Sequence, residues 1–408
     1  MAAIEQASAV YQILVANRLE HVRYAIRDVA AVAEKVARQG KPVVPLNVGD
    51  PLAFDFETPP HLIEAVSRAM RNGKNGYAPS PGLPEAIEAV RADSERRGIQ
   101  NVENVVMTYG VSEAIDFCLT ALVNSGENVL VPRPDYPMYS TILAKLQAQA
   151  NYYRLDEASG WEPDLDHMAA QVNAKTRAVV LVNPNNPTGA TYSRRTIEAV
   201  AELARRHRLL ILSDEIYDKL ILDGQQHHSA AVAAPDVPTV TFNGLSKAYL
   251  APGWRVGWAV VSGPRGTTET FSANLVKLAR ARLSASHPMQ HAVRPALEGS
   301  QEHLPRVIEK LRARRDLTQQ WCERTPGVSC VAPRGAFYAF PRFDIAGSDE
   351  EFAKQLVVEK QVSIVHGSGF GVPGATPHFR LVFLPKGEVL NQAYQKIADF
   401  LAEWRARI

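Results

Sequence analysis

Short apolar runs alternate with amphipathic stretches over the middle of the chain. The runs are rich in Val, Ile and Leu, and they are VENVVMT (102–108), NVLVP (128–132), AVVLVN (178–183), LLILS (209–213), PTVTFNG (238–244) and VGWAVV (256–261). Stretches between them, such as SRRTIEAVAELARRH (193–207), repeat apolar residues at helical spacing. Buried strands that alternate with helices are typical of parallel sheets. This pattern therefore predicts that residues 59–300 form a large α/β domain with a mostly parallel central sheet.

The pattern changes near residue 301. A long amphipathic helix is predicted over 301–322 and a last helix over 387–406, with the shorter apolar runs GAFYAFP, VSIVHG and FRLVFLP between them. These elements predict a smaller α+β domain over 301–408. Residues 1–58 contain a polar helical stretch and then PVVPLNVGDP, a short strand that runs into a turn. We expect this N-terminal segment to pack with the smaller domain.

Composition excludes several classes of protein. Lys and Arg total 45 and Asp and Glu total 43, which gives a net charge of +2 and argues against a nucleic-acid-binding surface. No apolar stretch approaches the ~18 residues of a membrane span, and the first residues do not resemble a secretory signal. Three cysteines without a CxxC pair favour neither a disulfide framework nor a thiolate metal site. We predict a cytoplasmic protein without a metal, in which the adjacent His227 and His228 are solvated.

Polar segments that could carry chemistry follow the predicted strands. In TYGVSEA (108–114), Gly110 opens a helix, and the free N–H groups of a helix start bind phosphate, although most such junctions bind nothing. In NPNNPTG (183–189), two prolines and a glycine form a rigid loop that presents Asn186; the alternative is an ordinary tight turn.

Asp214 ends the buried run LLILS in the segment SDEIY (213–217). A carboxylate at this place is costly unless it meets a cation. Tyr217, three residues later, can point the same way on a helical turn. The alternative for Asp214 is a helix N-cap.

Two basic residues in apolar settings complete the set. Lys247 lies in NGLSKAY (243–249), where desolvation could lower its pKa and make it a nucleophile, and Arg255 follows eight residues later as a candidate anion clamp. Arg380 interrupts the apolar strand HFRLVF (378–383), and its planar fork suits a carboxylate. The alternatives are a solvated lysine and an internal salt bridge.

In this order the segments resemble those of the class I and II aminotransferases, which are fold type I enzymes that use pyridoxal 5′-phosphate. The resemblance spans about residues 20–400. It implies that Lys247 forms the Schiff base and moves the proton between Cα and C4′, and that Asp214 keeps the pyridine nitrogen protonated. Asn186 and Tyr217 would hydrogen-bond O3′.

The resemblance also implies the remaining cofactor and substrate contacts. The phosphate would be held by Gly110, Val111 and Ser112 together with Ser246, Arg255 and a neighbouring subunit's Tyr77. Tyr136 would stack on the ring, and the substrate α-carboxylate would be bound by Arg380 with contacts from Gly49 and Asn186. A homodimer with shared sites is implied. One position departs from the pattern: Gly244 stands where some members have a serine.

Within the family the closest resemblance is to microbial alanine aminotransferases, through VRYAIRDV (22–29), LNVGDP, SDEIYDKL and FNGLSKAY. The implied reaction converts alanine and 2-oxoglutarate to pyruvate and glutamate by a ping-pong mechanism. Arg27 would bind the distal carboxylate of glutamate, and Arg282 is the alternative candidate for this role. Tyr24 would narrow the pocket around the methyl group of alanine. The alternatives are an aromatic or branched-chain aminotransferase, a carbon–sulfur β-lyase on the same scaffold, and a non-catalytic regulator.

Overall fold

The computed structural model describes residues 13–20, 22, 25–372 and 376–407, and for residues 25–27 only the backbone. Its centre is an eight-stranded sheet. In spatial order the strands are β2 (Val102–Tyr109), β9 (Val256–Ser262), β8 (Thr239–Gly244), β7 (Leu210–Asp214), β6 (Thr176–Val182), β3 (Asn128–Arg133), β4 (Gln149–Asp156) and β5 (Glu162–Pro163). Strands β8, β7, β6, β3 and β4 are parallel neighbours, whereas β9 and β5 run antiparallel to theirs. The predicted mostly parallel α/β sheet is confirmed.

Helices connect these strands, and several begin or end where local sequence chemistry requires. Ser193 caps the start of α7 by accepting a hydrogen bond from the N–H of Thr196 at 3.2 Å. The helices of the large part are α2 (Pro60–Arg71), α3 (Pro84–Arg96), α4 (Gly110–Leu122), α5 (Met138–Lys145), α6 (Leu165–Ala170), α7 (Arg194–His207), α8 (Ala230–Ala233), α9 (Glu269–Arg282), α10 (His287–Gln290) and α11 (Val293–Glu298).

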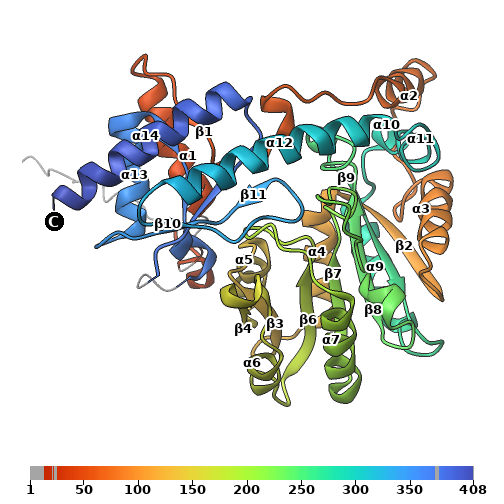
Figure 1. Ribbon diagram of the computed structural model, residues 1–408. Coiled ribbons are helices and arrows are strands. Elements are labelled where there is room, and N and C mark those ends of the chain that lie inside the picture. The colour runs from red at the N-terminus through yellow and green to blue at the C-terminus, as the bar shows by residue number, and fades with distance from the viewer. Residues whose placement is uncertain (1–12, 21, 23–24, 373–375, 408) are drawn as a thin grey trace, which may run out of the picture.

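A smaller α+β part combines both ends of the chain. The long helix α12 (His303–Arg324) crosses above the large sheet and leads into the smaller part, where α14 runs beside it (Figure 1). Its other elements are α1 (Ala25–Ala37), α13 (Asp349–Lys360), α14 (Gly387–Ala406) and the short strands β1 (Val44–Pro45), β10 (Val328–Ser329), β11 (Tyr338–Ala339), β12 (Arg342–Phe343), β13 (Val362–Ser363), β14 (Val365–His366) and β15 (Phe379–Val382). Strand β1 pairs in parallel with β13. Residues Val44–Pro45 of the N-terminal segment therefore contact this part, while the division into domains at residues 58 and 300 stays a prediction.

Strands of the smaller part are shorter than the apolar runs suggest. GAFYAFP contributes only the two residues of β11 to a ladder, and VSIVHG is split at Ile364 into β13 and β14. The split occurs because the two halves have different partners: β13 pairs with β1 and β14 pairs with β15. The remaining apolar residues of these runs are buried by packing rather than by pairing.

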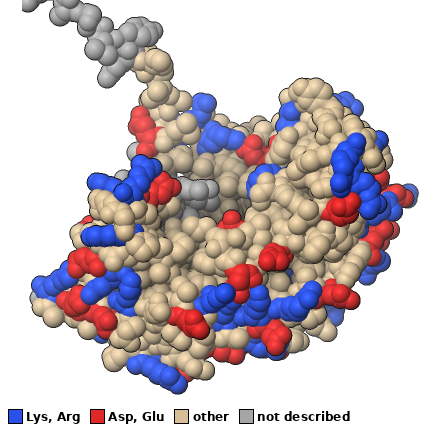
Figure 2. All heavy atoms as spheres, turned by 90° about the horizontal axis from the view of Figure 1, so that it is seen from above, with Lys and Arg blue, Asp and Glu red and all other residues tan. Residues whose placement is uncertain are grey.

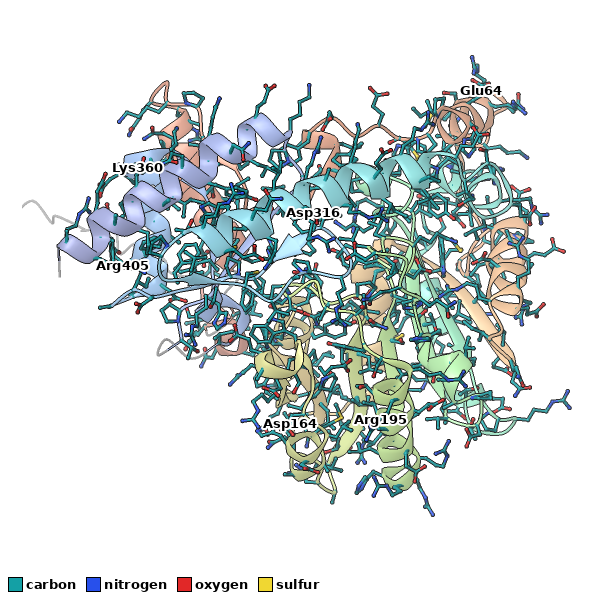
Figure 3. The ribbon with its side chains drawn as sticks, in the orientation of Figure 1. Glu64, Asp164, Arg195, Asp316, Lys360 and Arg405 are labelled. Atoms are coloured by element: carbon teal, nitrogen blue, oxygen red, sulfur yellow. The ribbon has the colours of Figure 1, made fainter. Side chains whose placement is uncertain are left out.

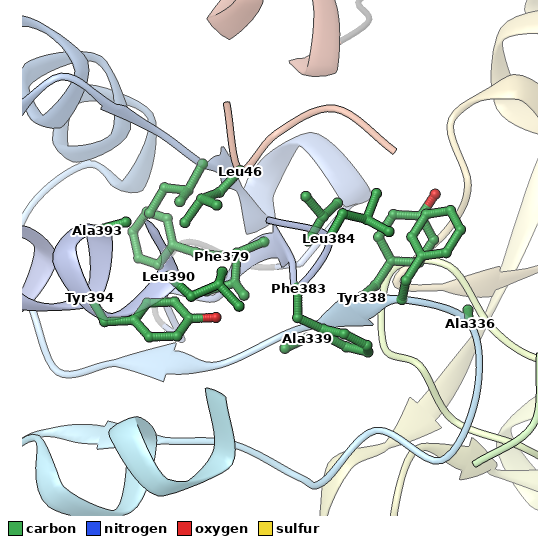
Figure 4. Close-up of a cluster of buried hydrophobic side chains, with 14 of the residues drawn as sticks. Leu46, Ala336, Tyr338, Ala339, Phe379, Phe383, Leu384, Leu390, Ala393 and Tyr394 are labelled. Atoms are coloured by element: carbon green, nitrogen blue, oxygen red, sulfur yellow. The ribbon is translucent and has the colours of Figure 1, made fainter. Parts of the chain in front are cut away.

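One large apolar cluster joins the N-terminal segment to the C-terminal elements. Leu46, Phe379, Leu384 and Leu390 are fully buried members of it, and Leu46, Phe379 and Leu390 lie close together in Figure 4. The carbonyl of Leu46 also accepts a hydrogen bond from the N–H of Val382 at 2.9 Å. Burial of four such side chains contributes on the order of 6–12 kcal/mol. This cluster fixes the loop after β1 against β15, and both reach the candidate site.

Many charged side chains lie on the outside, although a few, such as Asp214 and Arg380, are buried. Acidic and basic residues are interspersed over the face in Figure 2, and no single-sign patch dominates it. Glu64 points outward from α2 (Figure 3). Among the described residues, no helix has the length and apolar character needed to cross a membrane.

Candidate active site

Several strands of the large sheet end at one edge, and the polar segments of the sequence follow them. Val182 of β6 lies opposite Asp214 of β7, which lies opposite Phe242 of β8. Strand β2 runs in the same direction as β8, because both are antiparallel to β9 between them. The helix start at 110, the NPNNPTG loop, Asp214 and the lysine loop therefore meet at the carboxyl edge, where open α/β sheets bind ligands.

Asp214 is the last residue of β7, and its side chain is 3% exposed. One carboxylate oxygen accepts a hydrogen bond from the hydroxyl of Tyr139 and the other from the N–H of Ile216, each at 3.3 Å. Burial raises the pKa of Asp214 from 3.8 to about 7, and these two hydrogen bonds oppose that effect. A buried carboxyl in this condition favours a ligand that brings positive charge. The alternative role of Asp214 as a helix N-cap explains the hydrogen bond from the N–H of Ile216 but not the one from Tyr139.

Lys247 lies in the loop after β8 and is partly buried. Its Nζ donates a hydrogen bond to the carbonyl oxygen of Gly49 at 2.8 Å and lies 5.2 Å from the ring centre of Phe337. Burial lowers the pKa of Lys247 from 10.5 to about 8, and the positive charges of Arg380 and Arg255 act in the same direction. The solvated alternative is therefore wrong. A large fraction of this amine is neutral, and so nucleophilic, at mildly alkaline pH.

Tyr217 projects from the turn after β7 into the same space. Its hydroxyl lies 2.8 Å from the hydroxyl of Tyr338 on β11, and both side chains are buried. Burial raises the pKa of Tyr217 well above 10, so its hydroxyl remains protonated and can donate a hydrogen bond. The contact shows that the large and the smaller parts both contribute to the site.

Arg380 is 2% exposed in the middle of β15. Its guanidinium donates to Oδ1 of Asn186 at 3.1 Å and to the carbonyl oxygen of Asn47 at 2.7 Å. Over the described part of the chain, Nε has no hydrogen-bond partner and no carboxylate forms an ion pair with Arg380. The internal salt bridge considered from the sequence is thus not formed there. An orphaned buried donor on a cation suits an anionic ligand.

Close backbone approach shapes the opposite end of the site, at the start of α4. Gly110 has φ +73°, and a Cβ there would lie 2.5 Å from a terminal nitrogen of Arg255. A Cβ at Gly257 of β9 would lie 2.6 Å from the backbone nitrogen of Val111. The guanidinium of Arg255 donates to the carbonyl of Tyr109 at 3.3 Å, beside the helix start. The positive end of α4 and Arg255 together form a cradle for an anion.

Gly244 lies directly opposite Gly257 in the β8–β9 ladder. A Cβ at Gly244 would lie 2.6 Å from the carbonyl oxygen of Val256. A serine cannot occupy this position unless the backbone shifts, which explains the departure noted in the sequence. Ser246, which is 7% exposed, borders the cavity instead.

These groups enclose a cavity of about 380 Å³. The predicted residues that line it are Gly49, Val111, Ser112, Tyr136, Asn186, Asp214, Tyr217, Ser246, Lys247, Arg255 and Arg380. Asp50 and Tyr338 also line it and were not predicted, and neither was the contact of Tyr139 with Asp214. The spacing of Tyr136 and Tyr139, which places both on one turn, could have indicated Tyr139. The apolar run around Tyr338 carried no such signal.

Among the described residues, the predicted Tyr77 and Arg282 do not line this cavity. The side chain of Tyr77 is 84% exposed. Arg282 forms a salt bridge with Glu113 at 2.5 Å and is thereby engaged elsewhere. Tyr24 lies outside the described residues. Arg27 lies in the first turn of α1, but its side chain also lies outside the described part of the chain.

The chain is similar to known proteins over nearly its whole length. The sequence profile of the family described as aminotransferase class I and II matches residues 41–397. The glutamate-pyruvate aminotransferase AlaA of Haemophilus influenzae is 41% identical over 95% of this chain and 98% of its own. A crystal structure of an aminotransferase from Escherichia coli has a TM-score of 0.94 and 38% identity over 97% of this chain and 100% of that chain. The alanine aminotransferase of Pyrococcus furiosus has a TM-score of 0.92 and 37% identity over 96% and 100%.

Proposed function

This chain belongs to the class I and II aminotransferases, and on that premise we propose that it transfers the amino group of alanine to 2-oxoglutarate, giving pyruvate and glutamate. The observation that carries the proposal is the placement of Lys247, Asp214 and Arg380 in one cavity. The choice of alanine and glutamate is supported by the glutamate-pyruvate and alanine aminotransferases to which the chain is similar over nearly its whole length.

The cavity fits pyridoxal 5′-phosphate in three ways. The cradle of Gly110 and Arg255 suits the dianionic phosphate, the buried carboxyl of Asp214 suits a protonated ring nitrogen, and Lys247 supplies an amine for the aldehyde. Val111, Ser112 and Ser246 would add contacts to the phosphate, and Tyr136 would cover the ring. When bound, the cofactor supplies a carbonyl that accepts the amino group and a ring that accepts electrons.

The side chains of the cavity position the reactants and move protons. Asp214 would pair with a protonated ring nitrogen, because its own charge is unfavourable in this buried place without a cation. Lys247 would take a proton from the substrate Cα and deliver it to C4′ of the cofactor, for which a pKa of about 8 is suited. Asn186 has its amide oxygen bound to Arg380, so its NH₂ group is left to donate, as is the hydroxyl of Tyr217.

Arg380 accounts for recognition of the substrate. Its orphaned Nε and its neighbouring terminal nitrogen form a fork for the α-carboxylate that all amino donors share. Glutamate has a second carboxylate, whose burial without a partner would be costly. We propose that Arg27 binds this second carboxylate and that Tyr24 narrows the pocket around the methyl group of alanine. The engagement of Arg282 with Glu113 supports this choice between the two arginines.

A homodimer is part of the proposal. Tyr77 and Leu283 are large side chains that are 84% and 57% exposed in the single chain. Aromatic side chains are enriched at the centres of protein interfaces. We propose that a second copy covers Tyr77 and that Tyr77 reaches the phosphate of the neighbouring subunit's cofactor.

The test is a half-reaction. The holoenzyme is mixed with alanine or glutamate and no acceptor, and conversion of the bound cofactor to its amine form is followed by absorbance. One equivalent per site is expected, and pyruvate or 2-oxoglutarate should reverse it. A β-lyase would instead release ammonia and pyruvate continuously from a cysteine derivative. Lys247→Ala should bind the cofactor without the absorption band of the lysine-bound form and lose turnover, whereas Lys277→Ala, on the surface of α9, should behave like the parent. Near-normal transamination by Lys247→Ala would refute the assignment.

A further inference from the structure

The turn formed by residues 214–218 has two faces. Asp214 and Tyr217 face the cavity. Glu215 and Asp218, each one residue further along, are also buried, with exposed fractions of 0% and 8%. Their carboxylates meet the same guanidinium, that of Arg97, on the side away from the cavity. The turn is therefore held between a ligand-binding face and an ion-paired face.

Arg97 bridges the two carboxylates at short distance. Its guanidinium lies 2.6 Å from Oε2 of Glu215 and 3.2 Å from Oδ2 of Asp218. The side chain is 22% exposed, so the pairs are largely removed from water. Ion pairs of this kind lose much stability when one partner is removed, because the other is left as an uncompensated charge.

The position of Arg97 is set by the end of α3. Gly98 follows it with φ +94°, and the N–H of Ile99 bonds to the carbonyl of Ser94 at 3.0 Å. This pattern is typical of a glycine-terminated helix. Ile99 is 2% exposed and anchors the chain beyond the helix end. The guanidinium therefore arrives at the turn from a rigid element that is remote in sequence.

Glu215 is bound on every side. Its Oε1 accepts hydrogen bonds from the hydroxyls of Ser213 at 2.9 Å and Ser229 at 2.7 Å, and its carbonyl accepts one from the amide of Asn243 at 3.1 Å. His227, which we predicted to be solvated, is instead half-buried, with Nδ1 4.0 Å from Oε2 of Glu215. These bonds hold the carboxylate in place, but Arg97 provides the full positive charge.

We propose that Arg97 is a positioning residue for the reaction: by pairing with Glu215 and Asp218 it fixes the turn that carries Asp214 and Tyr217, and it shields Asp214 from the charge of Glu215. The proposal rests on the proposed function, since it concerns the same site. Electrostatics support the proposal. Burial is the main cause of the raised pKa of Asp214, and the negative charge of Glu215 raises this pKa further. The charged and titratable groups that face this assembly are Tyr139, Lys247, His227, Asp93 and Tyr249.

The test compares four variants of the holoenzyme: Arg97→Gln, Glu215→Gln, the double variant, and Arg96→Gln as a matched control. Arg96 is the preceding residue; its side chain is 54% exposed and pairs with Asp93, not with Glu215 or Asp218. The readouts are kcat and KM for alanine and the pH midpoint at which the absorbance of the bound cofactor changes. The midpoint is informative because a purely structural contact would not move it.

Arg97→Gln unmasks negative charge beside the site, so the midpoint should rise by about half a pH unit or more, and kcat should fall about tenfold with little change in KM, because Arg380 is untouched. Glu215→Gln should lower the midpoint. The midpoint of the double variant should return toward that of the parent. Arg96→Gln should have the same midpoint and kcat as the parent. If Arg97→Gln does not fold, the direction of the Glu215→Gln shift decides.

An unshifted midpoint in both single variants, or shifts of the same sign, overturns the proposal. Failure of the unmutated protein to bind the cofactor or to transaminate would refute the proposed function instead. The two failures are therefore distinguishable in one set of measurements.

Discussion

Replacing Asp214 by asparagine should stabilise the cofactor-free protein while it inactivates the enzyme. In the unfolded chain this carboxyl ionises near its ordinary pKa of 3.8, whereas in the folded chain burial moves the pKa to about 7. Because the folded pKa is raised, the stability contributed by the protonated carboxyl is fully present below pH 3.8 and is lost as pH rises toward 7. Each pKa unit is about 1.4 kcal/mol, so the charge costs up to about 4 kcal/mol above pH 7.

The substitution removes this cost without breaking the local hydrogen bonds. An asparagine oxygen can still accept from the N–H of Ile216, and its NH₂ group can donate to the hydroxyl oxygen of Tyr139. Asp214→Asn should therefore raise the unfolding free energy of the cofactor-free protein by up to about 4 kcal/mol at about pH 8, and by about 2 kcal/mol at about pH 5.

Urea unfolding of the parent and the variant across this pH range measures the difference directly. A difference that is constant with pH, or that shrinks as pH rises, would refute the assignment of a strongly raised pKa to Asp214. With pyridoxal 5′-phosphate bound, the order should reverse, because the protonated ring nitrogen compensates the charge of Asp214 only in the parent. The variant should then lose about three orders of magnitude in kcat, which corresponds to about 4 kcal/mol of activation free energy. A loss of tenfold or less would mean that the aspartate serves only as a cap.

Three further substitutions test other parts of the site. Arg380→Lys keeps the charge but loses the planar fork, so kcat/KM should fall about 100-fold for alanine and glutamate alike; a loss for one substrate only would contradict its role at the shared α-carboxylate. Gly110→Ala forces a Cβ toward Arg255 at φ +73°, and a fluorescence titration should show at least about tenfold weaker cofactor binding; parent-like affinity would argue against the phosphate cradle. Arg27→Ala, assayed in both half-reactions, should lower kcat/KM for glutamate and 2-oxoglutarate far more than for alanine and pyruvate. An equal fall would indicate a general defect of the N-terminal segment, and no fall would exclude Arg27.

Much of the site could be predicted from the sequence because its central residues follow apolar runs. Asp214 ends one such run, Asn186 follows another and Lys247 follows a third. In a parallel sheet, the polar residues after buried strands must emerge at one edge, so order along the chain predicts proximity in space. The same rule predicted the mostly parallel sheet, since burial on both faces requires continuous apolar strands.

The smaller part was harder to predict, because short ladders leave a weak pattern. The run around Tyr338 indicates a strand, yet only Tyr338 and Ala339 pair with β15, and the rest is buried by packing. Apolar residues that pack without pairing have the same composition as a strand. The sequence therefore indicated burial of this run but not the direction in which the hydroxyl of Tyr338 points.

By itself, the sequence determined the order of helices and strands, the loops that carry chemistry and the family they resemble. Only the tertiary structure decided which distant groups complete the site: Gly49 accepts a hydrogen bond from Lys247 across 198 positions of sequence, and Arg97 reaches Glu215 across 118. The reason is physical. Apolar periodicity and turn chemistry act over a few residues, whereas a hydrogen bond between remote elements forms only after their cores have packed and fixed the distance between them.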